Sequence, residues 1–276
     1  MQPDIDQVCG AIQDLQVRRK FIIKMETANT NMVKALVARM CGFDPNAEET
    51  AREKVWTRAG QIVRRALAER QQDEADLPIA KSVAPELEMV RRMLEPLLIR
   101  REEVEVEMAR LAMELPVNIQ VTGFKAIGLA VIVGEAGNLS NYATIRKLWR
   151  RFGLGMAPGH EGKAYSTHRR DGTFAGAPDE WIKAGYSPKR LGQVFGVVTV
   201  PLFMAKAKNQ YGAVYQKRRE HTAITHPDWT KGHSDMDARR VMVKAFLADL
   251  WREWRRSGHA VNAGRRLVDA TNSVAA

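Results

Sequence analysis

Cationic side chains gather in one stretch of the chain, at spacings that would suit contact with phosphate groups. Residues 117–154 predict two helices joined by a turn. A glycine turn at Gly123 opens an apolar helix that runs to about Val133, and Gly134 and Gly137 close it. Small residues in such turns let the backbone approach a phosphate closely, and amides at a helix N-terminus can hydrogen-bond it.

The second helix of this stretch follows a polar turn at 138–141. It carries four cations three to four residues apart, which predict a broad positive face: Arg146, Lys147, Arg150 and Arg151. The usual helix–hairpin–helix has a glycine where this chain has Lys125, and a lysine there would supply charge instead. The alternative interpretation is a plain helical hairpin within the core.

The charge of the protein is unevenly distributed. The 276 residues carry a net charge of +11, with a pI of about 9.8, which favours a polyanionic partner such as nucleic acid. Residues 1–115 hold 18 Lys and Arg against 20 Asp and Glu, whereas residues 116–276 hold 25 against 12. We therefore expect one region to contact phosphate and the other to support it.

The first part of the chain is predicted to be helical. Apolar residues at helical spacing indicate helices over 4–42 and from Pro45 to about Gln71, with a linker at 72–82. Residues 85–115 show a heptad pattern over about four repeats if Arg101 occupies one seam position. This pattern fits an antiparallel or dimeric coiled coil, or an ordinary amphipathic helix, and Pro96 should kink or restart it.

The second part is also predicted to be helical. A long Gly- and Pro-rich loop at 153–184 precedes a helix that begins at Ser187–Pro188 and is interrupted at Pro201. A loop over 221–234 leads to a helix capped by Asp235 or Asp237 that runs to about Arg256, before a frayed small-residue tail. The fold class is thus mostly α, with a helical and coiled-coil module (1–115) and a basic domain (116–276) containing the helix–hairpin–helix.

The basic domain resembles the C-terminal domain of the Piv/MooV invertases and related insertion-sequence transposases. The family's Glu-x-Gly-Asp-[Leu/Ile]-x-x-[Phe/Tyr] turn is matched, with Asn for Asp, by Glu135, Gly137, Asn138, Leu139 and Tyr142. A basic helix ending in Phe152, Gly153 and Leu154 follows, and similarity continues to about residue 256. The resemblance implies a DNA-binding, transposase-like protein, in which a structured RNA is a second candidate partner.

The resemblance also implies chemistry that this sequence matches incompletely. The family's RuvC-like acidic domain, which would bind divalent metal, has no counterpart in the sequence pattern. A nucleophilic serine is expected after the Gly-Leu pair, and the nearest candidate is Ser166, beside His168, Arg169 and Arg170. Its sequence context differs from that of the family, so we leave enzymatic activity open. A contact with phosphate or a structural role remains the alternative for Ser166.

The sequence therefore predicts a nucleic-acid-binding protein related to transposases and recombinases. Two alternatives stay open: a serine-dependent recombinase subunit completed by a partner chain, and an interaction protein assembled through the coiled coil. Residues 85–115 are expected to mediate homo-oligomerisation. The expected nucleic-acid contacts are Gly123, Lys125, Arg146, Lys147, Arg150, Arg151, Arg169, Arg170, Lys189 and Arg190.

No cofactor or metal is expected. His221, His226 and His233, with Asp228 and Asp235, fit no familiar zinc spacing. The two cysteines, Cys9 and Cys41, form no CxxC motif, and the start of the chain lacks the pattern of a signal peptide or membrane span. We therefore expect a reduced, cytoplasmic protein of bacterial type, associated with the nucleoid and not with a membrane.

Overall fold

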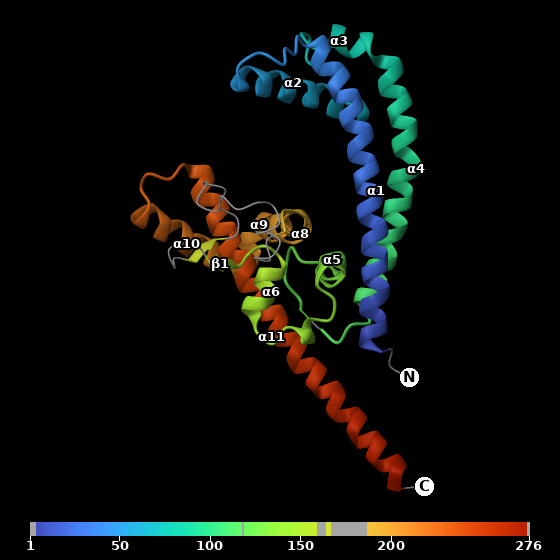
Figure 1. The fold of residues 1–276 in the computed structure, drawn as a ribbon, viewed down its shortest axis with the longest axis vertical. Helices are drawn as coiled ribbons and strands as arrows, with labels where there is room; N and C mark the ends of the chain where they lie inside the picture. The colour runs from blue at the N-terminus through green and yellow to red at the C-terminus, as the bar shows by residue number, and fades with distance from the viewer. Residues whose placement is uncertain (1–3, 118, 159–163, 167–186, 275–276) are drawn as a thin grey trace. The chain divides into compact units, whose positions relative to one another are not determined.

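The computed structural model describes the backbone of residues 4–117, 119–158, 164–166 and 187–274. It describes their side chains as far as residue 257, apart from those of 156–158, 164–166 and 188. The protein is mostly helical, which confirms the predicted fold class (Figure 1). The helices of the first part are α1 (Ile5–Met40), α2 (Glu49–Leu67), α3 (Leu77–Ser82) and α4 (Ala84–Ala112). Those that follow are α5 (Ala126–Ala136), α6 (Ile145–Arg151), α8 (Pro188–Val194), α9 (Val200–Met204), α10 (Tyr211–Thr225) and α11 (Lys231–Val274).

The chain forms two compact units, which we describe separately. Val17–Val106 forms the hairpin unit, and Met1–Gln16 together with Glu107–Ala276 forms the basic unit. The predicted domain boundary near residue 115 therefore falls inside the basic unit. The N-terminal part of α1 and the C-terminal end of α4 therefore belong to the basic unit.

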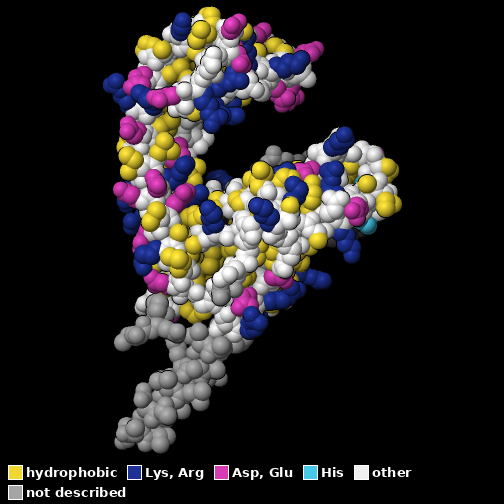
Figure 2. All heavy atoms as spheres, turned by 180° about the vertical axis from the view of Figure 1, so that it is seen from behind, with side chains coloured by type: hydrophobic (Ala, Val, Ile, Leu, Met, Phe, Trp, Pro, Cys, Tyr) yellow, Lys and Arg dark blue, Asp and Glu magenta, His cyan; other side chains and the backbone are white. Residues whose placement is uncertain are grey.

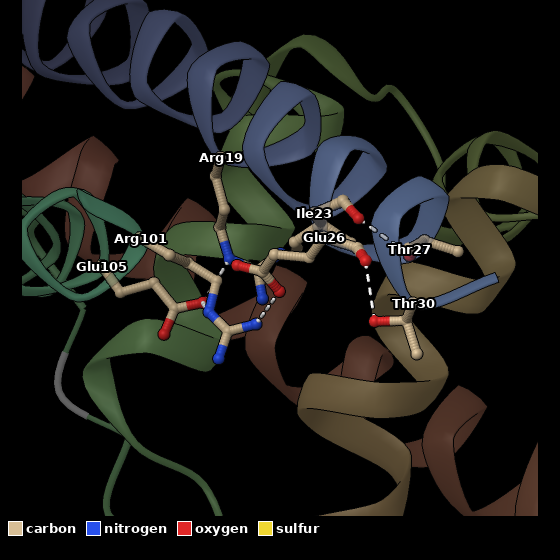
Figure 3. Close-up of polar contacts among 7 residues, drawn as sticks. All are labelled: Arg19, Ile23, Glu26, Thr27, Thr30, Arg101 and Glu105. Carbon is tan, nitrogen blue, oxygen red and sulfur yellow. Dashed lines mark hydrogen bonds and ion pairs between the residues drawn. The ribbon is translucent and has the colours of Figure 1, made fainter. Parts of the chain in front are cut away.

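The hairpin unit is built on the antiparallel pairing of α1 with α4. Arg19 Nε lies 2.7 Å from Glu105 Oε1, and Arg101 Nη1 lies 2.6 Å from Glu26 Oε2, so the two helices run in opposite directions (Figure 3). Arg101 thus takes the seam position that the heptad pattern requires. A polar pair within an apolar seam specifies which residues face each other, because shifting the register would leave charges unpaired.

The apolar seam of α4 is buried within the single chain. Its inward residues are Leu87, Val90, Leu94, Val104, Met108 and Leu111. In the hairpin unit the first three pack with Val33 and Val37 of α1 and with Ile62 and Val63 of α2. An oligomer through residues 85–115 would therefore have to use the outer face of α4, so homo-oligomerisation through this segment stays a prediction.

In the hairpin unit one local prediction is corrected, and one is narrowed. Residues 77–82 form the short helix α3 within the segment predicted to be a linker, with Pro78 in its first turn, where a proline is tolerated. Helix α4 continues through Pro96 without restarting. Pro96 is exposed, so the backbone carbonyl that loses its partner faces solvent.

The basic unit is organised around the apolar helix α5 and the long helix α11. Residues Leu129–Val133 of α5 are buried, and α5 contacts α8 and the following π-helical turn at Phe195–Thr199. Helix α11 contacts α6, α10 and the 3₁₀ turn η1 (Leu139–Asn141) (Figure 1). Gly134 lies inside α5, not at its end, and Gly137, with φ of +76°, is the residue that ends it.

Three further predictions change in the basic unit. Helix α10 runs to Thr225 and α11 starts at Lys231, so the predicted loop over 221–234 shrinks to a short turn. Asp235 and Asp237 lie within α11, so neither is a cap. Asp237 pairs with Arg218 of α10, whereas Asp235 pairs with Arg239 of α11 itself. The backbone of α11 continues through the predicted frayed tail to Val274.

A small two-stranded sheet interrupts the otherwise helical unit. Strand β1 (Met156–Pro158) pairs with β2 (Ala164–Ser166) in antiparallel register, with Met156 opposite Ser166. Ser187 caps α8 as its sequence predicts, since its Oγ accepts a hydrogen bond from the Arg190 amide. Cys9 is buried and Cys41 is half-buried, and both are free thiols.

Candidate nucleic-acid interface

The turn between α5 and α6 is fastened to the rest of the basic unit by a buried carboxylate. Glu135 is only 4% exposed. Its Oε1 accepts a hydrogen bond from Gln16 Nε2 at 2.8 Å, and its Oε2 lies 3.5 Å from Arg190 Nε. A buried carboxylate is stable only with such partners. Glu135, in the last turn of α5, therefore connects this helix with α1 and with the first turn of α8.

Asn138 and Tyr142 secure the same turn at its other end. Asn138 Oδ1 accepts hydrogen bonds from the Ser140 amide and from Trp254 Nε1, both at 3.0 Å. Tyr142 donates its hydroxyl hydrogen to the Ala136 carbonyl at 2.8 Å, and its own carbonyl accepts from Trp251 Nε1. The residues that carry the family resemblance thus have structural partners within this chain.

Helix α6 presents its cations on the side away from this framework. Leu148 is fully buried, and Trp149 Nε1 donates to the Lys244 carbonyl of α11 at 3.1 Å. Arg146, Lys147 and Arg150 are exposed. We call these three residues the α6 outer face. Because α6 is held on its inner side, the three cations have a fixed place on the surface.

Two of the predicted contacts turn inward instead. Arg151 is half-buried, and its Nε donates to the Glu135 carbonyl at 3.0 Å. Arg190 pairs with the Glu135 carboxylate, and its pKa is lowered by burial and by the nearby Arg151. Of the predicted pair Lys189 and Arg190, Lys189 is the exposed member. The i, i+4 pattern alone could not separate these side chains from the outer face.

The glycine of the predicted hairpin meets protein and not open surface. Gly123 has φ of +92°, and a Cβ placed on it would lie 2.5 Å from the Pro201 carbonyl oxygen of α9. Lys125, at the N-cap of α5, is exposed. The close approach that a glycine allows here is therefore used by the packing of α9. Lys125 keeps its predicted place on the surface.

The candidate catalytic residue is described only in its backbone. Ser166 ends β2, and its side chain lies outside the described part of the structure. Arg169 and Arg170 lie outside the described residues as well. Their predicted roles stay predictions.

Positive charge prevails on the described surface of the basic unit. Between residues 119 and 257, the described side chains include 19 Lys and Arg against 7 Asp and Glu. Among the seven acids, Glu135 is buried, and Asp235, Asp237, Asp249 and Glu253 pair with arginines. On the face drawn in Figure 2, Lys and Arg side chains are spread over this unit and acidic side chains are fewer.

The α10–α11 hairpin contains an ionic cluster around Asp237, a residue that the sequence predicts as a possible helix cap. Burial opposes ionisation of Asp237, but Arg218 Nε at 2.6 Å and the nearby Arg240 outweigh it and hold the pKa of this carboxyl below its ordinary value. Because the pKa of Asp237 is lowered in the folded state, its ionised carboxylate stabilises the protein at pH values above the ordinary aspartate pKa of about 4. That stability is lost as the pH falls through the lowered value.

Replacing Asp237 with asparagine should therefore lower the melting temperature near neutral pH. The difference from the wild type should shrink as the pH is reduced from about 5 toward 2, because the wild-type carboxyl is then protonated too. Thermal unfolding followed by circular dichroism over this pH range measures the effect. Asp228→Asn, at an exposed site, is the control. A difference that stays constant with pH would contradict the assignment.

The turn between α10 and α11 holds three stacked aromatic rings. The ring centroids of His226 and Trp229 are 4.1 Å apart, and those of Trp229 and His233 are 4.0 Å apart. Their spacing of three and four residues is a signal that the sequence itself carries. Among the described residues, no group of three or more His, Cys, Asp or Glu side chains could hold a metal ion.

The comparisons with known proteins give no family assignment. The chain matches no family model, no curated protein and no solved structure. Among the described helices, none combines the length and apolar character needed to cross a membrane. The geometry and charge of the basic unit are therefore the basis for its proposed function.

Proposed function

We propose that the basic unit binds the phosphate backbone of nucleic acid through the α6 outer face. The observation that carries this proposal is that Arg146, Lys147 and Arg150 are exposed together on α6. The opposite side of this helix is hydrogen-bonded to α11. Arg146 and Arg150 are four residues apart, so they repel each other unless an anion lies beside them. A polyanion relieves this repulsion at several cations at once.

The distribution of the remaining charges supports the same partner. Lys125 and Lys189 are exposed on the same unit, and its acids are mainly buried or paired. Contacts of cations with phosphate fix the position of a protein without reading sequence. We therefore propose binding with little sequence preference, with DNA as the first partner and structured RNA as the second. In terms of the family resemblance, this is the part that a transposase C-terminal domain would play in holding DNA.

Neutralising the α6 outer face should reduce the salt dependence of binding. Each lost phosphate contact lowers the slope of log K against log salt concentration by about 0.7–0.9, so Arg146→Gln, Lys147→Gln and Arg150→Gln together should lower it by about 2–3. Fluorescence anisotropy with a labelled 20-base-pair duplex, at several salt concentrations, measures the slope.

The matched control removes three exposed cations from the hairpin unit: Arg18→Gln, Lys24→Gln and Arg39→Gln. It changes the net charge equally but should leave the slope unchanged. Equal losses of slope in both triple variants would show a general charge effect and overturn the assignment to α6. A wild-type protein that binds neither duplex nor single strand would overturn the proposed function itself.

A further inference from the structure

The tryptophans that the structure describes in the basic unit fall into two groups. Trp149, Trp251 and Trp254 each donate the indole N–H to a group elsewhere in the unit, at 3.0–3.1 Å. These three indoles hold helices α6 and α11 and the α5–α6 turn together. Trp229 lies in the turn between α10 and α11, and its indole N–H has no hydrogen-bond partner among the described residues. Among the described residues, the contacts of the Trp229 side chain are therefore those of its stacked ring.

The three rings at this turn form a parallel column. The planes of His226 and Trp229 are inclined by 6°, and those of Trp229 and His233 by 5°. Two imidazoles at about 4 Å from one indole would collide if they shared a face, so they lie on opposite faces of Trp229. The column ends on His233, which is exposed, whereas His226 is half-buried.

The local backbone holds this column in place. The Trp229 amide donates to the His226 carbonyl at 3.1 Å, which closes the turn. The His233 amide donates to Thr230 Oγ1 at 3.2 Å in the first turn of α11. The bond at His233 uses its backbone amide, so the contact described for its imidazole is the stack on Trp229. Because the indole separates the two imidazoles, they cannot both reach one metal ion at about 2.0–2.1 Å.

Exposed cations lie on both helices that this turn connects. Lys231 is exposed at the start of α11, and Arg219 Nη1 donates to the Lys231 carbonyl at 3.0 Å. Lys217 is also exposed on α10. Flat aromatic rings next to cations are the combination that binds unpaired bases, because every base offers a π-face and every nucleotide a phosphate.

We propose that the His226–Trp229–His233 column is a stacking platform for an unpaired base, which lies on the exposed face of His233. This inference rests on the proposed function and adds a preference for single-stranded nucleic acid or frayed ends over intact duplex. In a blunt duplex the bases are already stacked on each other, so only an unpaired base can use the platform fully.

The test measures binding of the full chain to a labelled single-stranded DNA 20-mer. His233→Ala should weaken binding about 5- to 20-fold, near the low end of the range for base–aromatic stacking because imidazole is a small ring. His233→Phe should retain most of the affinity. The salt slope should stay unchanged in both variants, because no phosphate contact is removed.

Two controls separate stacking from other causes. His221→Ala removes an exposed imidazole of α10 outside the column and should leave affinity unchanged. An abasic 20-mer keeps the backbone but lacks bases, so His233→Ala should not weaken its binding. Fluorescence of a 2-aminopurine placed in the 20-mer should fall on binding to the wild type and less on binding to His233→Ala.

The outcomes distinguish this inference from the proposed function. If the wild type binds with normal salt dependence but His233→Ala and His221→Ala behave alike, the platform is overturned and phosphate binding stands. Equal weakening of the abasic and normal 20-mers by His233→Ala would also overturn it. If the wild type binds no nucleic acid, both proposals fail.

Discussion

Replacing Trp254 with alanine is expected to lower the free energy of unfolding by about 3–5 kcal/mol. Trp254 is fully buried in the basic unit. Its truncation leaves a large cavity that the rigid surroundings fill only in part. It also removes the donor that satisfies Asn138 Oδ1, at the turn that α11 holds in place.

Urea unfolding followed by circular dichroism measures this loss. Trp254→Phe keeps most of the ring volume but lacks the N–H, so it should cost clearly less than the alanine variant. Trp229→Ala, at a half-buried ring in a surface turn, should cost less than Trp254→Ala too. A loss below about 1 kcal/mol for Trp254→Ala would show that α11 does not anchor the turn as described.

Replacing Gly123 with alanine should destabilise the protein by about 2–5 kcal/mol. The residue has a positive φ, where a side chain costs roughly 1–2 kcal/mol, and the new Cβ would collide with the Pro201 carbonyl, which adds about 1–3 kcal/mol. The neighbouring atom is backbone, so it cannot rotate away. The Cβ would also meet Ala205 Cβ at 2.8 Å.

This variant also separates two roles for the glycine turn. If Gly123 serves packing, Gly123→Ala lowers stability and leaves the affinity of the folded protein for DNA intact. If it served the approach of a phosphate, as the hairpin pattern predicted, affinity would fall while stability held. Gly192→Ala is the control, because a Cβ there meets no atom within 4 Å and alanine suits a helix better than glycine. Urea unfolding and DNA anisotropy on the same samples give both readouts.

The basic unit consists of a hydrogen-bonded framework and a surface that presents the proposed binding groups. The framework consists of Glu135, Asn138 and the three bonded indoles, and changes in it should affect stability first. The surface consists of the α6 outer face and the stacked column, and changes there should affect binding first. Variants of the framework should therefore change the free energy of unfolding, whereas variants of the surface should change the affinity for nucleic acid.

The sequence by itself determined the helices and the asymmetry of charge. Apolar residues three and four apart place α1, α2 and α4 close to where they occur, because this spacing expresses a local backbone geometry. Gly137 and Ser187 mark helix ends for equally local reasons, a positive φ in one case and a side-chain cap in the other. The seam position of Arg101 could also be predicted from the heptad.

Only the tertiary structure decided where the charged and aromatic side chains go. Arg150 and Arg151 are neighbours on one basic helix, yet Arg150 is exposed and Arg151 reaches the Glu135 carbonyl. Asp237 resembles a cap in sequence but pairs with Arg218 of α10. A long side chain at the edge of a helix face can turn to water or to another element. The choice depends on partners distant in sequence, which helical periodicity does not encode.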